Sequence, residues 1–185
     1  MLKHVVNNIK IKKVVLIPTY LSPQKSTGLL TAQQRYDCLQ QISHLYPGSN
    51  KGIDYECLDY EIKQKKPVYS IDTINMMCDT YNNNNIMLLL GSDQLFNFHT
   101  WKEYQQIVKM VDICVVKRDA YPISTYMEYL KKYIYTLDSK HIIILNNPVF
   151  NVSSTDIRSK LTDKSYLSKT MPQEVMNYLI KNNDK

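Results

Sequence analysis

The residues best placed to do chemistry are Gly91-Ser92-Asp93 and Trp101, which lies eight residues beyond Asp93. They follow the apolar run Ile86 to Leu90, which is typical of a buried strand. Glycine allows a tight turn there, and Asp93 could accept hydrogen bonds from a ribose or bind through Mg²⁺. Trp101, the only tryptophan, could stack on a ring bound near the aspartate. The alternative is that Asp93 caps the next helix and Trp101 fills the core.

A second candidate is an anion site in the segment Phe150 to Arg158. Ser153 and Asp156 have the spacing of a capping box, which by itself predicts only a capped helix. A helix N-terminus also offers free N–H groups and partial positive charge. The hydroxyls of residues 153–155, together with Arg158, would complete a site for a polyphosphate. We favour this interpretation because the segment also follows a predicted strand.

The third candidate is the loop from Ile17 to Lys25, in which Pro18 and Pro23 restrict the backbone. The loop ends in Lys25, which could meet a phosphate. The alternative is an ordinary surface loop, and the residues alone favour that alternative.

Alternating helices and strands must position these three loops. Unbroken apolar strands that alternate with helices are typical of a parallel sheet covered on both faces. We therefore expect a doubly wound, Rossmann-like α/β fold whose ligand lies at the carboxyl ends of the strands. Helices are expected at about Met1 to Ile11, Thr31 to Tyr46, Tyr69 to Tyr81, Trp101 to Lys109 and Pro122 to Tyr135, with a last helical region from Ser153 past Pro172 to Ile180. Strands are expected at Val14 to Ile17, Ile86 to Leu90, Val111 to Val116 and His141 to Leu145, with extended chain at Ile53 to Ile62 and a turn at Asn82 to Asn85.

Length and composition restrict the class of protein. A chain of 185 residues fits one domain over residues 1–185, with a C-terminal helical part at about 153–182. No apolar run approaches the roughly 18 residues that span a bilayer, so no membrane partner is expected. Only four glycines occur, which leaves little room for a glycine-rich phosphate loop.

The net charge of +6 suits an anionic partner, either nucleic acid or a small phosphorylated substrate. The lysines are scattered and are not interleaved with aromatic residues, so we expect a solvated basic surface and no nucleic-acid partner. Four cysteines without a C-x-x-C pair predict free thiols in a reducing cytoplasm; they are Cys38, Cys57, Cys78 and Cys114. The N-terminus has no signal-peptide core.

The three loops, in this order, resemble motifs of the nicotinate-nucleotide adenylyltransferase family, in the nucleotidyltransferase superfamily of α/β enzymes. The resemblance spans essentially the whole chain. Residues 17–25 resemble I-P-x-x-x-P-P-H-K, residues 67–73 resemble P-S-Y-T-x-x-T, and residues 91–93 with Thr100-Trp101 resemble G-x-D…T-W. Residues 152–158 match I-S-S-T-x-I-R, and residues 171–180 resemble the closing helix L-P-x-x-V-x-x-Y-I.

The resemblance implies transfer of AMP from ATP to nicotinate mononucleotide, which gives nicotinate adenine dinucleotide and pyrophosphate in NAD synthesis. Mg²⁺ would accompany ATP. By position, Asp93 would hold the mononucleotide ribose and Trp101 would stack on the pyridine ring, while Tyr69, Ser70, Thr73 and Lys102 would line the pocket around its carboxylate. The phosphates of ATP would be bound by Lys25, Gly91, Ser153, Ser154, Thr155 and Arg158. Such a reaction needs positioning and charge neutralisation, with no protein nucleophile.

One family motif has no counterpart in this sequence. The family's first strand leads into G-G-x-F-D-P-x-H-x-G-H, whose histidines contact the ATP phosphates, and His4 and His44 do not match it. We expect that strand and motif, roughly 20 residues on a strand of ordinary length, to precede Met1. A sheet without the strand would have a gap and an unpaired edge.

Two further hypotheses stay open. The chain could be a non-catalytic nucleotide-binding protein that keeps the mononucleotide pocket, and its activity without the histidine motif is open. A basic nucleic-acid-binding domain is the least favoured. The sequence decides neither the oligomeric state nor the preference for the acid over the amide mononucleotide.

Overall fold

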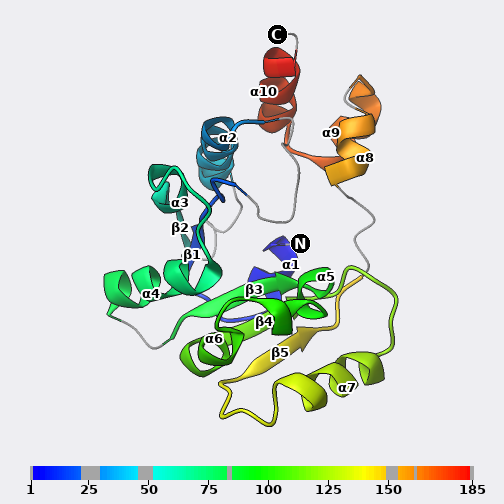
Figure 1. Ribbon diagram of the computed structural model, residues 1–185. Coiled ribbons are helices and arrows are strands. Elements are labelled where there is room, and N and C mark those ends of the chain that lie inside the picture. Colours follow the sequence, from blue (N-terminus) through cyan, green and yellow to red (C-terminus); the bar gives the residue numbers. More distant parts are fainter. Residues whose placement is uncertain are drawn as a thin grey trace. The chain divides into compact units, whose positions relative to one another are not determined.

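The computed structural model describes residues 2–21, 30–45, 52–82, 85–148, 154–160 and 162–183. The chain divides into two compact units: unit 1 is Met1–Val5 with Tyr69–Asn151, and unit 2 is Val6–Val68 with Val152–Lys185. The described strands pair only in parallel, and they form two sheets (Figure 1). The parallel α/β fold predicted from the sequence is confirmed.

Unit 1 is built on a three-stranded sheet in the order β3-β4-β5. The strands are β3 (Met87–Gly91), β4 (Asp112–Val116) and β5 (Ile142–Leu145), and Gly91 pairs with Val116, which pairs with Leu145. The carboxyl ends of the three strands therefore lie at one edge. In β4, residues 113–116 are at most 1% exposed, as expected for the central strand of a covered parallel sheet.

Helices of unit 1 pack their apolar residues against this sheet. Buried residues of α4 (Ser70–Tyr81), α6 (Tyr104–Met110) and α7 (Ile123–Tyr133) share one core with β3 and β4. In α7, Tyr126, Tyr129 and Leu130 have the spacing of one helix face and are buried. Between β3 and α6 lie α5 (Ser92–Leu95) and the 3₁₀ helix η2 (Phe98–Thr100).

Unit 2 contains the parallel pair β1 (Lys13–Leu16) and β2 (Asp54–Cys57). Helix α2 (Ala32–Leu45) packs on β2 and on α10 (Gln173–Asn183), and α3 (Tyr60–Lys63), α8 (Ser154–Ser159) and α9 (Lys164–Thr170) complete the unit. Helix α1 (Leu2–Asn8) crosses from one unit to the other. At the start of α2, Thr31 Oγ1 accepts from the Gln34 amide at 3.2 Å, and Gln34 Oε1 accepts from the Thr31 amide at 2.8 Å. The predicted cap at Thr31 is confirmed, and the pair forms a capping box.

Three local predictions are wrong. Residues 60–63, expected to be extended, form α3, where Lys63 pairs with Asp59 at 3.0 Å one helical turn away. The last helical region is three helices: Asp163 accepts from the Tyr166 amide and begins α9, and Met171 before Pro172 is extended because proline disfavours a helical residue before it. Helix α6 begins at Tyr104, since Glu103 has a φ of 53°.

Of the described residues, none belongs to a helix long and apolar enough to cross a membrane. The four cysteines form no disulfide, as the sequence predicted. Cys114 is fully buried, and burial raises the pKa of its thiol to about 11.

Candidate active site

The turn at Gly91 brings the loops after β3 and β4 together. A Cβ atom on Gly91 would clash with Asp93 Oδ1 and would lie 2.7 Å from Arg118 Cδ. Gly91, not Asp93, is the capping position of α5, and Asp93 lies inside its first turn. The alternative that Asp93 caps this helix is therefore wrong, and its side chain is directed to another partner.

That partner is Arg118, which follows β4. Its Nη1 atom lies 3.3 Å from Asp93 Oδ2, and the two side chains are 41% and 47% exposed. An exposed pair of this kind adds little to stability. The pair instead presents two charged groups, still accessible, at the carboxyl ends of neighbouring strands, where ligands bind in this type of fold. Sequence reasoning missed Arg118, although its position directly beyond a predicted strand could have found it.

A buried serine lies beneath this pair. Ser92 is fully buried, and its Oγ donates to Asp119 Oδ2 at 2.5 Å and accepts from the Arg118 amide at 2.9 Å. Asp119 Oδ1 accepts from the Tyr126 hydroxyl at 2.7 Å and from the Tyr121 amide at 3.1 Å. These hydrogen bonds join the loop after β3 to the loop after β4.

Asp119 is held in its ionised form. Its burial by itself would raise the pKa of the carboxyl group, but the hydrogen bonds from Ser92, Tyr126 and the Tyr121 amide, with the nearby charge of Lys117, hold the pKa below its ordinary value. Burial and the bond to Asp119 raise the pKa of Tyr126 to about 12. At neutral pH the carboxylate therefore only accepts, and both hydroxyl groups donate to it.

Asn147 joins the next pair of strands in the same way. It is 7% exposed, and its Oδ1 accepts from the Lys117 amide at 2.9 Å while its Nδ2 donates to the Lys117 carbonyl at 2.9 Å. The amide side chain thus extends the pairing of β4 and β5 beyond their ends. Neither Asn147 nor Asp119 was predicted from the sequence, because only the tertiary fold supplies their partners.

Trp101 packs on the core of unit 1 and also remains partly exposed. Its ring centroid lies 5.1 Å from that of buried Phe98. Helix α5 and η2 carry the chain from Asp93 to Trp101, and the Asn97 amide group donates to the Asp93 carbonyl at 3.1 Å. The exposed part of the indole is available to a flat ring.

The structure brings Tyr69 and Lys102 together. Lys102 Nζ lies 4.6 Å from the centroid of the Tyr69 ring, which is 50% exposed. Ser70 and Thr73 lie in the first turn of α4, and the amide of Thr73 donates to the Tyr69 carbonyl at 3.3 Å. Lys102 thus lies beside the segment that carries Tyr69, Ser70 and Thr73, at the start of α4.

The residues predicted to bind ATP phosphates belong, except Gly91, to unit 2. Lys25 and Ser153 lie outside the described residues, and for Ser154, Thr155 and Arg158 the structure describes only the backbone of α8. The loop from Ile17 to Lys25, called the lysine loop below, is hydrogen-bonded near its start. Arg35 donates to Thr19 Oγ1 at 3.2 Å and to the Tyr20 carbonyl at 3.1 Å.

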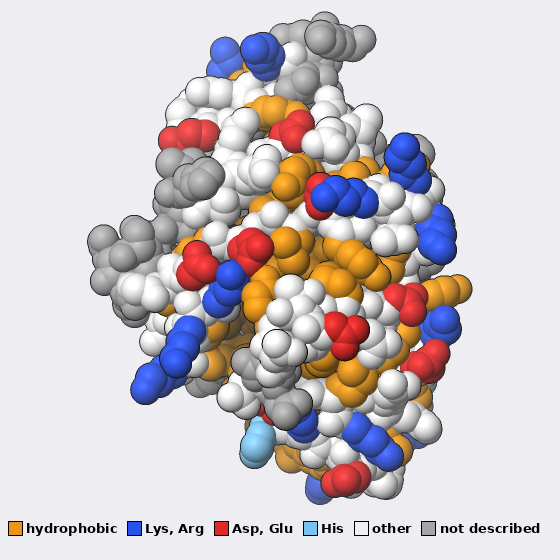
Figure 2. All heavy atoms as spheres, turned by 90° about the vertical axis from the view of Figure 1, so that its left-hand side faces the viewer, with side chains coloured by type: hydrophobic (Ala, Val, Ile, Leu, Met, Phe, Trp, Pro, Cys, Tyr) orange, Lys and Arg blue, Asp and Glu red, His pale blue; other side chains and the backbone are white. Residues whose placement is uncertain are grey.

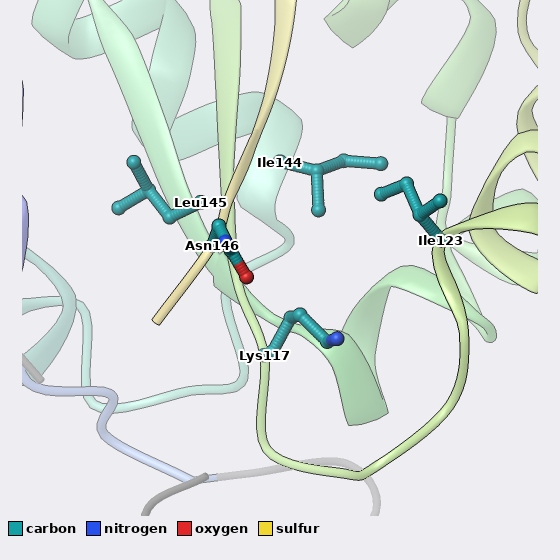
Figure 3. Close-up of a pocket in the computed structure, with 5 residues that line it drawn as sticks. All are labelled: Lys117, Ile123, Ile144, Leu145 and Asn146. Atoms are coloured by element: carbon teal, nitrogen blue, oxygen red, sulfur yellow. The ribbon is translucent and has the colours of Figure 1, made fainter. Parts of the chain in front are cut away.

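A pocket of about 350 Å³ opens at the carboxyl ends of β4 and β5 (Figure 3). Ile144 and Ile123 point toward each other across it, and Lys117 lies at its rim. Leu145 and Asn146 complete the lining. None of the predicted site residues lines this pocket. Its lining is largely apolar and includes one charged side chain, Lys117.

No three His, Cys, Asp or Glu side chains gather as a metal site within the described part of the chain. Mg²⁺ commonly keeps several waters and takes one or two carboxylates together with substrate phosphates. Asp93 is a partly exposed carboxylate at the carboxyl end of β3.

Basic side chains are dispersed over the face of the molecule that is drawn in Figure 2. Figure 2 shows Lys and Arg side chains spread over the visible face among acidic ones, without a single basic patch. Some are neutralised: Lys13 Nζ lies 3.0 Å from Asp54 and 2.7 Å from Glu56. This distribution agrees with a solvated basic surface.

The structure is a parallel α/β fold with a charged pair of side chains at the carboxyl ends of neighbouring strands. A family described as "Cytidylyltransferase-like" matches residues 1–160. The chain belongs to this cytidylyltransferase-like family.

Relatives narrow the comparison. The chain is 29% identical to a protein of Aliarcobacter butzleri over 95% of this chain and 85% of that protein, and 30% identical to one of Dictyoglomus thermophilum over 94% and 84%. Both carry the name "Probable nicotinate-nucleotide adenylyltransferase". The resemblance drawn from the motifs is thereby confirmed.

Solved structures share the fold. The nicotinic acid mononucleotide adenylyltransferase of Plasmodium falciparum, complexed with NaAD, matches with a TM-score of 0.75 and 18% identity over 99% of this chain and 87% of that one. The same protein complexed with APC matches with a TM-score of 0.69 and 17% identity over 97% and 86%.

Proposed function

We propose that the protein is a nicotinate-nucleotide adenylyltransferase, which transfers AMP from ATP to nicotinate mononucleotide and releases pyrophosphate. The observation that carries the proposal is the cluster of Gly91, Asp93 and Arg118 at the carboxyl ends of β3 and β4. Two relatives that align with more than nine-tenths of this chain carry the name of this activity, which supports the proposal. A reaction of NAD synthesis fits a cytoplasmic protein with free thiols.

The mononucleotide would lie along unit 1. Asp93 would accept hydrogen bonds from its ribose, and Arg118, freed in part from Asp93, would face its phosphate. Trp101 would stack on the pyridine ring. The ring's carboxylate would lie near Tyr69, Ser70, Thr73 and the positive charge of Lys102.

ATP would be held by its phosphates. The proposed contacts are Lys25, the backbone at Gly91, Ser153, and the α8 residues Ser154, Thr155 and Arg158. Mg²⁺ bound to the phosphates would neutralise part of their charge. The chain's own contribution is to hold the mononucleotide phosphate in line with the α-phosphorus of ATP, without a covalent intermediate.

Calorimetric titration and pyrophosphate release test the proposal. We expect the wild-type chain to bind nicotinate mononucleotide and Arg118→Ala to bind it at least about tenfold more weakly, because a charge-assisted contact is lost. The matched control is Arg35→Ala, which removes an arginine whose partners are Thr19 and Tyr20. Equal losses for both variants, or no binding by the wild type, would contradict the proposal.

A non-catalytic nucleotide-binding protein is the second candidate, because the sequence holds no H-x-G-H motif. Both candidates predict binding, and only turnover separates them. Pyrophosphate release by this chain supports the enzyme. Binding of the substrates without release of pyrophosphate supports the second candidate.

A further inference from the structure

A hydrogen-bonded group under the candidate site is assigned no part in the binding described above. It consists of Ser92, Asp119 and Tyr126, with the Arg118 amide. Ser92 and Tyr126 are fully buried. The only polar atom of the Ser92 side chain is engaged twice, since Oγ both donates to Asp119 and accepts from the Arg118 amide.

The residues of this group are sequence neighbours of Asp93 and Arg118. Ser92 lies between Gly91 and Asp93, and Asp119 directly follows Arg118. The bond between Ser92 and Asp119 therefore fixes the backbone on both sides of the Asp93–Arg118 ion pair. The ion pair itself, at 3.3 Å between two partly exposed side chains, is a weak constraint.

We propose that Ser92 and Asp119 are positioning residues, which set the loops after β3 and β4 so that Asp93 and Arg118 meet the ribose and phosphate of the mononucleotide. This inference rests on the proposed function. The ionised carboxylate of Asp119 only accepts hydrogen bonds, so the Ser92 hydroxyl must donate to it and turns a lone pair to the Arg118 amide. The negative charge of Asp119 thus determines which atom donates in each of these hydrogen bonds.

Tyr126 provides a matched control. Its hydroxyl bonds to the same carboxylate at 2.7 Å, against 2.5 Å for Ser92, and it is equally buried. It comes from α7, and its bond to Asp119 does not join the loop after β3 to the loop after β4. Tyr126→Phe and Ser92→Ala thus each remove one hydroxyl donor from Asp119, but only Ser92→Ala removes the hydrogen bonds of Ser92 to Asp119 and to the Arg118 amide.

Titration of nicotinate mononucleotide into the full chain measures the effect. We expect Ser92→Ala to weaken binding about tenfold or more and Tyr126→Phe to stay within about twofold of wild type, although both lower the melting temperature. Equal weakening by the two variants would show a general loss of stability and overturn the inference. So would unchanged binding by Ser92→Ala.

Hydrogen exchange of the free protein gives a readout that needs no ligand. We expect Ser92→Ala to speed exchange both in peptides that cover residues 88–95 and in peptides that cover residues 115–121. We expect Tyr126→Phe to speed exchange only in the peptides that cover residues 115–121. No change at 88–95 in Ser92→Ala overturns the inference. Failure of the wild type to bind the mononucleotide overturns the proposed function and this role together. If the wild type binds but the two variants do not differ, the proposed function stands and the positioning role is wrong.

Discussion

The Nη1 atom of Arg118 lies 3.3 Å from the carboxylate of Asp93, which joins the loop after β4 to the loop after β3. The two residues are 25 positions apart in sequence, and the pairing of Gly91 with Val116 places them at one edge of the sheet. Gly91 makes the approach feasible because it lacks the Cβ atom that would clash with both side chains. The ion pair between Asp93 and Arg118 therefore requires a residue without a side chain at the turn.

The first prediction concerns Gly91. Gly91→Ala must displace Asp93 and Arg118, so we expect its affinity for nicotinate mononucleotide to fall at least about tenfold, while overpacking lowers the unfolding free energy by about 1–3 kcal/mol. Calorimetric titration and denaturant unfolding measure the two effects.

Gly52→Ala is the control for that substitution. Gly52 has a φ of 65°, and among the described residues beyond its chain neighbours no atom lies within 4 Å of the position that a Cβ atom would take, so alanine there costs about 1–2 kcal/mol through backbone strain. We expect its affinity for the mononucleotide to match that of the wild type. Weaker binding by both variants would remove the special role of Gly91.

The second prediction uses Trp101 as a probe. Because it is the only tryptophan, its fluorescence reports directly on the candidate site, and we expect nicotinate mononucleotide to quench it. Trp101→Ala should weaken binding by about 1–3 kcal/mol, the range for one stacked base. Trp101→Phe keeps an aromatic face and should retain most of the affinity. Equal affinities of the alanine variant and the wild type would exclude stacking.

The third prediction concerns pH. The pKa of Asp119 is lowered in the folded protein, so its ionised form stabilises the fold above its unfolded pKa of 3.8, and this stabilisation is lost as pH falls through the lower folded value. We therefore expect the difference in unfolding free energy between wild type and Asp119→Asn to be constant from about pH 8 to pH 5 and to shrink below about pH 4. Urea unfolding at each pH measures it, and a difference that grows on acidification would refute the assignment.

The fourth prediction concerns thiol reactivity. Cys114 is fully buried with a pKa of about 11, so almost none of it is thiolate at pH 8 and no reagent reaches it in the folded state. Cys78 is partly exposed and serves as the internal control. Maleimide labelling followed by peptide mass mapping should modify Cys78 in the native protein and Cys114 only after unfolding. Similar native labelling of both would disprove the burial of β4.

The sequence by itself determined the order of helices and strands, because buried parallel strands are continuous apolar runs and helices carry apolar residues at helical spacing. It also determined the loops that carry Asp93, Trp101 and Tyr69, since these loops resemble family motifs. It missed the short helix α3 and the breaks around Asp163 and Pro172, where local hydrogen bonds and proline geometry override the regional pattern.

Only the tertiary structure decided which side chains meet at the site. Arg118, Asp119 and Asn147 acquire their roles from partners 25 to 30 residues away, and no local spacing encodes such contacts. The register of β3, β4 and β5 brings the loops that follow these three strands to one edge of the sheet. Because buried polar groups are almost always paired, the serine between Gly91 and Asp93 is bonded to Asp119, which lies in the loop after the next strand.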